Sequence, residues 1–287
     1  MGYNLSKNLN MKIIVTGAGG FIAQNILKHL CNLKNIKIKA FLKKKTKVFK
    51  NKNITYKIKK IEDIKKKDLK GYHAIFHYAS TGARNFYKNK NFFNEFQNTY
   101  ETNVIHTLNL FELALQSGIK RLVVPGSCFE YGLSAKKNKK LSVKTSLLPK
   151  GYYSMSKASL YFHLKNFYQK NKKLNIIYLR YFQVFGEGEK KPRLWAQLKH
   201  NAKNNKKFTV ENGSLVRDFI SVDLVSSRTI EIFNNRKKGF VLKNMGNGKG
   251  MSISNFSKLW WKKFKGRKKL IIKNYKTPHI NYLVSKN

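Results

Sequence analysis

The sequence contains very little cysteine and proline. Among its 287 residues are 2 Cys and 4 Pro. The cysteines, Cys31 and Cys128, show neither the pairing of a disulfide framework nor the spacing of a metal site. A small disulfide-stapled scaffold is therefore excluded, and the chain fits a reducing compartment. With so few prolines, no segment has the composition of a flexible hinge between independent domains.

Long apolar runs are also missing. No run approaches the roughly 20 residues that a membrane-spanning helix needs, and the amino terminus lacks the apolar stretch of a secretory signal. Residues 1–10 are polar and are expected to form an extension ahead of the first strand. From these observations we expect a cytoplasmic protein without a membrane partner.

Negative charge is scarce. The chain has 60 Lys and Arg against 13 Asp and Glu, for a formal net charge of +47. Such an excess is typical of nucleic-acid binders, but the lysines are spread over residues 43–70, 137–140, 203–207 and 262–269 instead of one arm or one helix face. This distribution favours a lysine-rich solvated surface over a nucleic-acid interface, and its positive field would attract ligands that carry phosphates.

Apolar and aromatic residues are abundant enough to build a sizeable core. Hydrophobic residues make up 41% of the chain, which includes 20 Phe and 15 Tyr. Short β-branched runs alternate with longer segments of helical period, the pattern of βαβ units around a parallel sheet. The expected strands span residues 12–16, 36–42, 54–58, 73–79, 121–124, 175–181 and 240–243.

Two intervening segments carry apolar residues three or four positions apart, as one face of a helix requires. The first runs from Ile22 to Leu33, and the second from Val104 to Leu115, where Gly118 ends it. The predicted fold class is therefore α/β: a Rossmann-like doubly wound parallel sheet with a small, mostly C-terminal substrate-binding lobe.

A glycine cluster lies between the first expected strand and the first expected helix. Gly17 suits the tight turn, Gly20 lets a pyrophosphate approach the backbone, and a small residue at Ala23 lets helix and strand pack closely. The phosphates would then bind the helix N-terminus, with Phe21 and Ile22 in its first turn. Strand, glycines and helix in this order predict a dinucleotide site.

The end of the second expected strand bears on which dinucleotide binds. An acidic residue there would accept from a ribose 2′-hydroxyl, whereas a cation would suit a 2′-phosphate. The sequence offers no Asp or Glu but has Lys43 and Lys44. These lysines favour NADP. In so basic a chain, however, a lysine at this position is explained almost equally well by composition alone, so the cofactor is predicted as NAD or NADP.

Tyr153 and Lys157 open another segment of helical period. Four residues apart, they share one helix face, and an ammonium is expected to lower the pKa of a neighbouring phenol toward neutral pH, where it can exchange protons. Ser127 follows the strand expected at 121–124, at the sheet edge where ligands of open α/β sheets bind. Next to it, Cys128 is interpreted as a small buried thiol, with a second acid–base group as the alternative.

Taken together, these motifs resemble the extended short-chain dehydrogenase/reductases, in particular their nucleotide-sugar epimerase, dehydratase and reductase group. The resemblance covers about residues 11 to 255. It rests on these residues and segments, in order along the chain: Gly17, Gly20 and Ala23; 63–64; 77–80; 103–104; 127–132; 153–157; 180–186; and 217–220.

The resemblance implies roles for individual residues. Ser127, Tyr153 and Lys157 would be the catalytic triad. The cofactor would contact Gly17, Gly20, Phe21, Ile22, Lys43, Asp63, Ile64, Ala79, Asn103, Tyr153 and Lys157. The substrate would contact Ser127, Gln183, Arg193, Leu194, Phe208 and Arg217. The histidines lack the spacing of ligands, so no metal is expected.

Departures from the family pattern narrow the chemistry. Dehydratases of the group carry an Asp-Glu pair directly after the catalytic hydroxyl, where this chain has Cys128 and Phe129, so dehydration is not expected. Gln183 replaces the Asn that usually follows the Arg-Tyr-Phe run. The chemistry that remains is hydride transfer at a ring carbon of a nucleotide-diphosphate sugar, with C4 the expected carbon. It would be either 4-epimerisation or reduction of a 4-keto sugar.

The expected domain layout also follows the family. Residues 11–182, completed by about 218–250, would form the dinucleotide-binding domain, and residues 183–217 and 251–287 the nucleotide-sugar lobe. A homodimer through the helices that bear Asn103 and Tyr153 is expected. The alternative from another class is a non-catalytic basic scaffold that binds nucleic acid or acidic lipid, which the intact triad disfavours.

Overall fold

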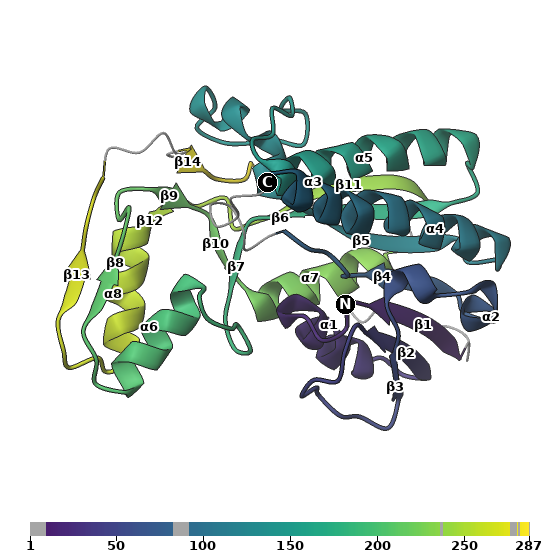
Figure 1. Ribbon diagram of the computed structural model, residues 1–287, viewed down its shortest axis with the longest axis horizontal. Helices are drawn as coiled ribbons and strands as arrows, with labels where there is room; N and C mark the ends of the chain where they lie inside the picture. Colours follow the sequence, from purple (N-terminus) through teal and green to yellow (C-terminus); the bar gives the residue numbers. More distant parts are fainter. Residues whose placement is uncertain (1–9, 83–91, 236–237, 276–279, 281, 287) are drawn as a thin grey trace. The chain divides into compact units, whose positions relative to one another are not determined.

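The structure is a computed structural model that describes residues 10–82, 92–235, 238–275, 280 and 282–286 (Figure 1). The extension expected at residues 1–10 therefore lies outside the described residues, apart from Asn10. The chain divides into two compact units. The first comprises residues 1–124, 162–177 and 229–241, and the second comprises residues 125–161, 178–228 and 242–287.

A seven-stranded sheet is the largest element, with strand order β11-β6-β5-β4-β1-β2-β3. β1 pairs in parallel with β2 and β4, β2 with β3, and β4 with β5. From β3 to β6 the order is that of a doubly wound dinucleotide-binding sheet, which confirms the predicted fold class. The strands are β1 (Met11–Thr16), β2 (Ile36–Leu42), β3 (Ile54–Ile58), β4 (Ala74–His77), β5 (Arg121–Ser127), β6 (Asn175–Tyr181) and β11 (Gly239–Met245).

Four strands, β1, β4, β5 and β11, have bounds that differ from the prediction, and the ends of β4 and β5 concern the site. β4 ends at His77 instead of Ala79, because Tyr78 and Ala79 pass across the glycine turn: a Cβ on Gly17 would lie 2.4 Å from the Ala79 nitrogen. β5 continues to Ser127, three residues past Val124. Ser127 is therefore the last residue of a strand.

The helical segments of the first unit begin with α1, which buries Ala23, Ile26 and Leu30. α1 ends at Cys31, so the helix stops two residues before Leu33, the last residue of the predicted apolar series. The helix predicted from Val104 begins instead as one turn of π-helix. The segments are α1 (Phe21–Cys31), η1 (Ile61–Asp63), α2 (Lys66–Leu69), α3 (Phe92–Tyr100), the π-helix η2 (Glu101–Ile105) and α4 (His106–Gln116), with α7 (Val222–Asn234) entering from the second unit.

The second unit contains short helices, one long helix and three small sheets, ordered β10-β7, β12-β9-β14 and β13-β8. Its helices are η3 (Cys128–Tyr131), η4 (Leu133–Lys136), α5 (Tyr152–Lys170), which continues into the first unit, α6 (Leu194–Lys203) and α8 (Ile253–Lys263). Its strands are β7 (Gln183–Phe185), β8 (Phe208–Val210), β9 (Val216–Arg217), β10 (Phe219–Ser221), β12 (Met251–Ser252), β13 (Leu270–Ile272) and β14 (Tyr282–Leu283).

An aromatic cluster holds α6, α8, β8 and β13 together, the group at the left of Figure 1. Trp195, Phe256 and Trp261 are buried in it, and Trp260 packs against them. Phe219 stacks on Phe256 with ring centroids 3.8 Å apart. Such a cluster gives a small lobe its own core.

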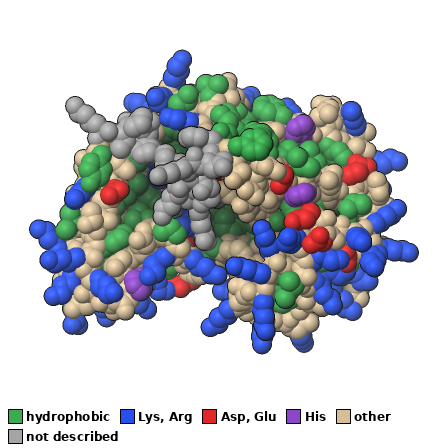
Figure 2. Space-filling view, viewed as in Figure 1, with side chains coloured by type: hydrophobic (Ala, Val, Ile, Leu, Met, Phe, Trp, Pro, Cys, Tyr) green, Lys and Arg blue, Asp and Glu red, His purple; other side chains and the backbone are tan. Residues whose placement is uncertain are grey.

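The surface agrees with the charge distribution of the sequence. Figure 2 shows Lys and Arg side chains along the lower part and the edges of the visible face, with fewer acidic side chains among them. Within the described residues, no helix combines the length and apolar character that crossing a membrane requires.

Candidate active site

The glycine turn after β1 is built so that only glycine fits at its first position. Gly17 has a φ of +61°, and a Cβ there would lie 2.4 Å from the Ala79 nitrogen and 2.5 Å from the Tyr78 carbonyl carbon. A side chain at this point is excluded both by the left-handed backbone and by the chain that follows β4. The turn therefore brings Gly17 against Ala79, and the cofactor contacts of both residues stay predictions.

The N-terminus of α1 is open to an anion. Gly20 precedes the helix and provides no side-chain cap, and the first turn contains no acidic residue. The N–H groups at this end, including those of Phe21 and Ile22, therefore receive no side-chain cap from Gly20 and face no carboxylate of the first turn. Free amides and the helix dipole favour a phosphate here, so these residues fit the pyrophosphate of a dinucleotide.

Three further cofactor candidates lie at the ends of β2 and β3. Lys43 directly follows β2 and is exposed. Asp63 is exposed at the end of η1, and Ile64 beside it is buried. An exposed cation after β2 and an exposed carboxylate after β3 are available to a ligand, and their roles stay predictions.

Asn103 is buried on the π-helix η2, and its side chain is engaged by the loop after β4. Its Oδ1 accepts from the Ser80 hydroxyl at 3.0 Å and from the Thr81 N–H at 2.9 Å, and its amide donates to the Thr81 carbonyl at 3.0 Å. Asn103 thereby fixes the loop that begins at Ala79. Its contact with the cofactor stays a prediction, and the role that the hydrogen bonds show is to anchor this loop.

The structure brings the three predicted catalytic residues together. Ser127 ends β5, while Tyr153 and Lys157 lie one turn apart near the start of α5. A side-chain hydrogen bond joins Tyr153 to Ser127. The Lys157 ammonium donates to the carbonyl of Pro125 on β5 at 3.2 Å, and Lys157 is 4% exposed. A phenol and a hydroxyl in contact, with an ammonium beside the same strand, are groups of the kind that acid–base catalysis uses.

The pKa of Tyr153 does not move in the direction predicted from the sequence. Burial raises it to about 12, the negative charge of Glu130 adds to the rise, and the hydrogen bond to Ser127 opposes it. The expectation that Lys157 brings the phenol toward neutral pH is therefore wrong for the protein alone. The loss of solvation outweighs the stabilisation of the phenolate.

The pKa of Lys157 also shifts so that the charged form of the side chain is disfavoured. Burial lowers its pKa to about 8, and the carboxylate of Glu130 is the group that resists this fall. At neutral pH the ammonium therefore keeps its charge with only a small margin.

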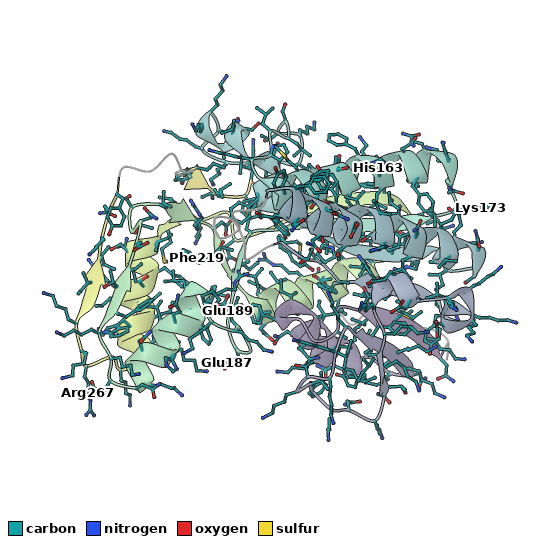
Figure 3. The ribbon with its side chains drawn as sticks, in the orientation of Figure 1. His163, Lys173, Glu187, Glu189, Phe219 and Arg267 are labelled. Atoms are coloured by element: carbon teal, nitrogen blue, oxygen red, sulfur yellow. The ribbon has the colours of Figure 1, made fainter. Side chains whose placement is uncertain are left out.

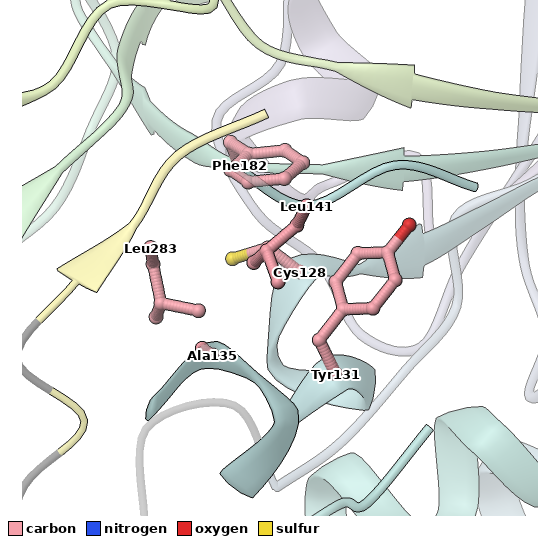
Figure 4. Close-up of a cluster of buried hydrophobic side chains, with 6 residues drawn as sticks. All are labelled: Cys128, Tyr131, Ala135, Leu141, Phe182 and Leu283. Carbon is pink, nitrogen blue, oxygen red and sulfur yellow. The ribbon is translucent and has the colours of Figure 1, made fainter. Parts of the chain in front are cut away.

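Cys128 lies next to Ser127 but is a core residue. It is 3% exposed and packs with Leu141, Phe182 and Leu283, as Figure 4 shows. Burial raises the pKa of its thiol to about 12. A thiol that stays protonated in an apolar cluster is no base at neutral pH, which favours the small buried thiol over the alternative.

The sequence analysis missed the group that supports this triad. Glu130 is fully buried, and its carboxylate accepts from the Ser127 N–H at 2.7 Å and from Arg180 Nε at 2.7 Å. Arg180 lies inside β6, a strand that is buried along its whole length. A lone arginine in so apolar a run was the available signal, because a buried cation requires a partner.

Arg193, one of the predicted substrate residues, acts electrostatically on the triad. Its positive charge lowers the pKa of Tyr153. Its Nε donates to Glu189 at 2.7 Å, and a terminal nitrogen donates to the Val184 carbonyl at 3.3 Å. Figure 3 labels Glu189 and Glu187 on the segment between β7 and α6. Arg193 is thus held in one orientation at the start of α6.

The other predicted substrate residues are more dispersed. Arg217 on β9 acts on the same region, since its charge lowers the pKa of Cys128. Gln183 begins β7 and is half-buried. Leu194 and Phe208 pack against the aromatic cluster. Their contacts with a ligand stay predictions.

Side chains able to hold a metal do not gather in the described part of the chain. In residues 10–82, 92–235, 238–275 and the described C-terminal positions, no group of three or more His, Cys, Asp or Glu could hold an ion. His77 is instead hydrogen-bonded to the Thr16 hydroxyl at 2.8 Å and to the Thr107 hydroxyl at 2.9 Å.

The chain belongs to the NAD dependent epimerase/dehydratase family, whose sequence profile matches residues 13–238. Among curated relatives, an ADP-L-glycero-D-manno-heptose-6-epimerase from Brachyspira hyodysenteriae is 29% identical over 266 residues, covering 86% of this chain and 79% of that protein. Both findings agree with the resemblance drawn from the motifs.

Solved structures share the fold. A UDP-N-acetylglucosamine 4-epimerase from Methanobrevibacter ruminantium M1, in complex with UDP-N-acetylmuramic acid, superposes with a TM-score of 0.82 at 22% identity, covering 96% of this chain and 89% of that chain. A dTDP-glucose 4,6-dehydratase from Bacillus anthracis strain Ames, in complex with NAD, gives 0.80 at 22% identity, covering 96% and 88%. Epimerases and dehydratases of nucleotide sugars thus have this architecture.

Proposed function

We propose that the protein is an NAD(P)-dependent oxidoreductase or epimerase of a nucleotide-diphosphate sugar, with hydride transfer at a ring carbon, C4 in our assignment. The observation that carries the proposal is the hydrogen bond between Tyr153 and Ser127, with the buried Lys157 ammonium one helical turn away. Proton exchange with a sugar hydroxyl or carbonyl needs this set of groups.

Each member of the triad has a distinct task. Tyr153 exchanges the proton of the sugar oxygen, and Ser127 donates to or accepts from the same oxygen to hold it in line. The Lys157 ammonium stabilises the phenolate form of Tyr153. A bound dinucleotide would supply the hydride acceptor and donor for this exchange. The residues that would hold this dinucleotide are Gly17, Gly20, Phe21, Ile22, Lys43, Asp63, Ile64, Ala79 and Asn103.

Redox without dehydration is proposed because neither of the two residues after Ser127 has a group that gains and loses a proton near neutral pH. The Cys128 thiol is buried with its pKa raised to about 12, and Phe129 has no ionisable group. A dehydratase must protonate and deprotonate neighbouring sugar carbons, which a buried neutral thiol and a benzyl ring do not do.

The diphosphate of the substrate is assigned to cations near the triad. Arg193 and Arg217 both act electrostatically on the segment that contains Ser127 and Tyr153. Guanidinium groups bind phosphates in a bidentate manner, which suits this role. Gln183, Leu194 and Phe208 would complete the walls of the substrate site.

The test is the substitution Tyr153→Phe, with Tyr152→Phe as the matched control on the same helix. Both variants are assayed with NAD and NADP against a panel of UDP, dTDP, GDP, CDP and ADP sugars, and products are identified by nuclear magnetic resonance. Loss of the acid–base hydroxyl should lower turnover by at least about 10²-fold, while Tyr152→Phe stays near wild type. Near-normal turnover of Tyr153→Phe would contradict the proposed mechanism.

Mass spectrometry of the purified protein separates the two reactions within this class. A retained NAD points to 4-epimerisation, because the hydride is returned to the same sugar. An empty site that accepts NADPH points to reduction of a 4-keto sugar, and would give the exposed Lys43 a role at the 2′-phosphate.

A further inference from the structure

A carboxylate that the triad does not include lies directly behind it. Glu130 is 0% exposed, and Arg180, its ion-pair partner at 2.7 Å, is 1% exposed. Glu130 also accepts from the Ser127 N–H at 2.7 Å and from the Tyr178 hydroxyl, whose oxygen is 2.9 Å away. Every one of these donors belongs to β5 or β6, the strands that lead into the site.

The surrounding backbone makes room for this carboxylate. At Gly126, a Cβ would lie 2.6 Å from Glu130 Oε1 and 2.4 Å from Tyr178 Cε1. Any side chain on Gly126 would therefore displace the carboxylate, the tyrosine ring or both. A glycine inside β5 at this point is explained by the buried group it admits.

Stability alone does not account for the pair. Burying a carboxylate and a guanidinium costs several kcal/mol per ion in solvation, and apolar residues of the same volume often stabilise a fold equally well. The pair does supply direction, because each hydrogen bond fixes a specific atom. The atoms it fixes are those next to the catalytic groups.

Tyr178 carries the connection to the helix of Tyr153 and Lys157. Its single hydroxyl proton is shared between two acceptors, Glu130 Oε1 and the main-chain carbonyl of Lys157, and the hydroxyl oxygen lies 2.9 Å from each. The Lys157 ammonium returns to β5 by its bond to the Pro125 carbonyl. The end of β5 and the Lys157 turn of α5 are thus connected through the carboxylate of Glu130.

The charge of Glu130 also acts on both titrating groups. It raises the pKa of Lys157, against the effect of burial, and it raises the pKa of Tyr153. The other groups that act on Tyr153 are Arg193, whose charge lowers its pKa, and Cys128. Arg180 is the cation bound to Glu130 itself.

We propose that Glu130 is a positioning residue: its buried carboxylate holds the Ser127 main chain directly and the Lys157 turn through Tyr178, which fixes the triad. The kinetic part of this inference rests on the proposed function. The positional part does not rest on it, since it concerns only where Ser127 and Lys157 lie.

The first test is Glu130→Gln, which keeps the shape and removes the charge. Turnover should fall by about 10-fold or more, and the whole pH–rate profile should move to lower pH, because both Tyr153 and Lys157 lose a carboxylate that raises their pKa values. The unpaired Arg180 cation acts in the same direction. A merely structural role would lower the rate equally at every pH and leave the profile in place.

The second variant covers the case in which Glu130→Gln fails to fold. Tyr178→Phe keeps the Glu130–Arg180 pair and removes only the hydroxyl that reaches Lys157, and Tyr168→Phe on α5 is its control. We expect Tyr178→Phe to lower kcat by about 5-fold or more with an unchanged KM for the dinucleotide, and Tyr168→Phe to behave as wild type.

Crystal structures of wild type and Tyr178→Phe give a readout that needs no turnover. A displacement of the Lys157 or Ser127 side chain by about 0.5 Å or more supports the proposal, since catalytic groups must keep their geometry on that scale. Unmoved side chains together with a wild-type kcat would overturn it. A wild type without activity on any sugar would refute the proposed function, and the displacement would still decide the positioning role.

Discussion

At the scale of single residues, burial dominates the chemistry of the site. Burial raises the pKa of Tyr153 to about 12 and lowers that of Lys157 to about 8, each against its charged form. Sequence spacing identified both residues and their common helix face, but it gave the wrong sign for the phenol. The depth of burial and the nearby Glu130 carboxylate depend on tertiary contacts, which spacing along one helix does not contain.

The pKa of Lys157 sets a pH limit on activity. A lysine is charged below its pKa, so the ammonium to which we assign stabilisation of the phenolate is lost as pH rises through about 8, well below the usual 10.5. We expect kcat to fall above about pH 8. In Lys157→Arg the guanidinium stays charged, so the rate at neutral pH should be lower but the alkaline fall should be absent.

This prediction is checked by pH–rate profiles of both proteins with saturating substrate. An alkaline fall that persists unchanged in Lys157→Arg would assign the limit to another group.

Cys128 offers a contrasting prediction about a neighbour of Ser127 that takes no part in proton transfer. Cys128→Ala should keep turnover within about threefold of wild type, because the thiol is buried and neutral. Its unfolding free energy should fall by about 1 kcal/mol through the small cavity left in the cluster of Leu141, Phe182 and Leu283. Kinetics and denaturant unfolding measure the two effects, and a 10²-fold loss of turnover would make the thiol an acid–base group.

At the scale of elements, the sequence predicted the central strands well and the small ones poorly. β2, β3 and β6 have the predicted bounds, since each is a compact β-branched or apolar run between turns. The two- and three-residue strands of the second unit, such as β9 and β12, were not predicted. Their pairing is set by partners far along the chain, and so short a segment has no periodicity to detect.

The buried Glu130–Arg180 pair was missed for the same reason. The two residues are 50 positions apart, and only the pairing of β5 and β6 in one sheet brings their strands together. The triad itself was found because Tyr153 and Lys157 lie within one helical turn, where spacing alone places them on one face.

The glycine turn yields a prediction with a matched control. Gly17 and Gly71 both have positive φ, but a Cβ on Gly17 would collide with the backbone of Tyr78 and Ala79, whereas nothing lies within 4 Å of a Cβ on Gly71. Gly71→Ala should cost about 1–2 kcal/mol of stability from backbone strain alone. Gly17→Ala should cost more and should also abolish dinucleotide binding.

Calorimetric titration with NAD and NADP, beside denaturant unfolding, measures both effects. Undiminished binding by Gly17→Ala would show that the dinucleotide is held elsewhere.

At the scale of the whole molecule, we propose a homodimer through the helices that bear Asn103 and Tyr153. Each carries exposed apolar side chains: Ile105 on η2 is 53% exposed and Met155 on α5 is 40% exposed. In the proposed dimer these side chains would be buried against the second copy. Met155→Asp should therefore shift the protein toward monomer, while Leu259→Asp on α8, where the leucine is 42% exposed, should not.

Light scattering coupled to size exclusion tests this at several protein concentrations. A monomeric wild type, or an equal response of the two variants, would contradict the proposed interface.

The most direct test of the central claim is the rate at which wild type and Tyr153→Phe, each supplied with NAD and NADPH, convert nucleotide-diphosphate sugars, followed by nuclear magnetic resonance of the sugar. This readout detects both 4-epimerisation, which returns its hydride to the sugar, and reduction of a 4-keto sugar. If Tyr153 exchanges the proton that accompanies hydride transfer, the wild-type protein converts at least one sugar, and Tyr153→Phe does so at least about 10²-fold more slowly. A Tyr153→Phe variant that matches the wild-type rate would contradict the account.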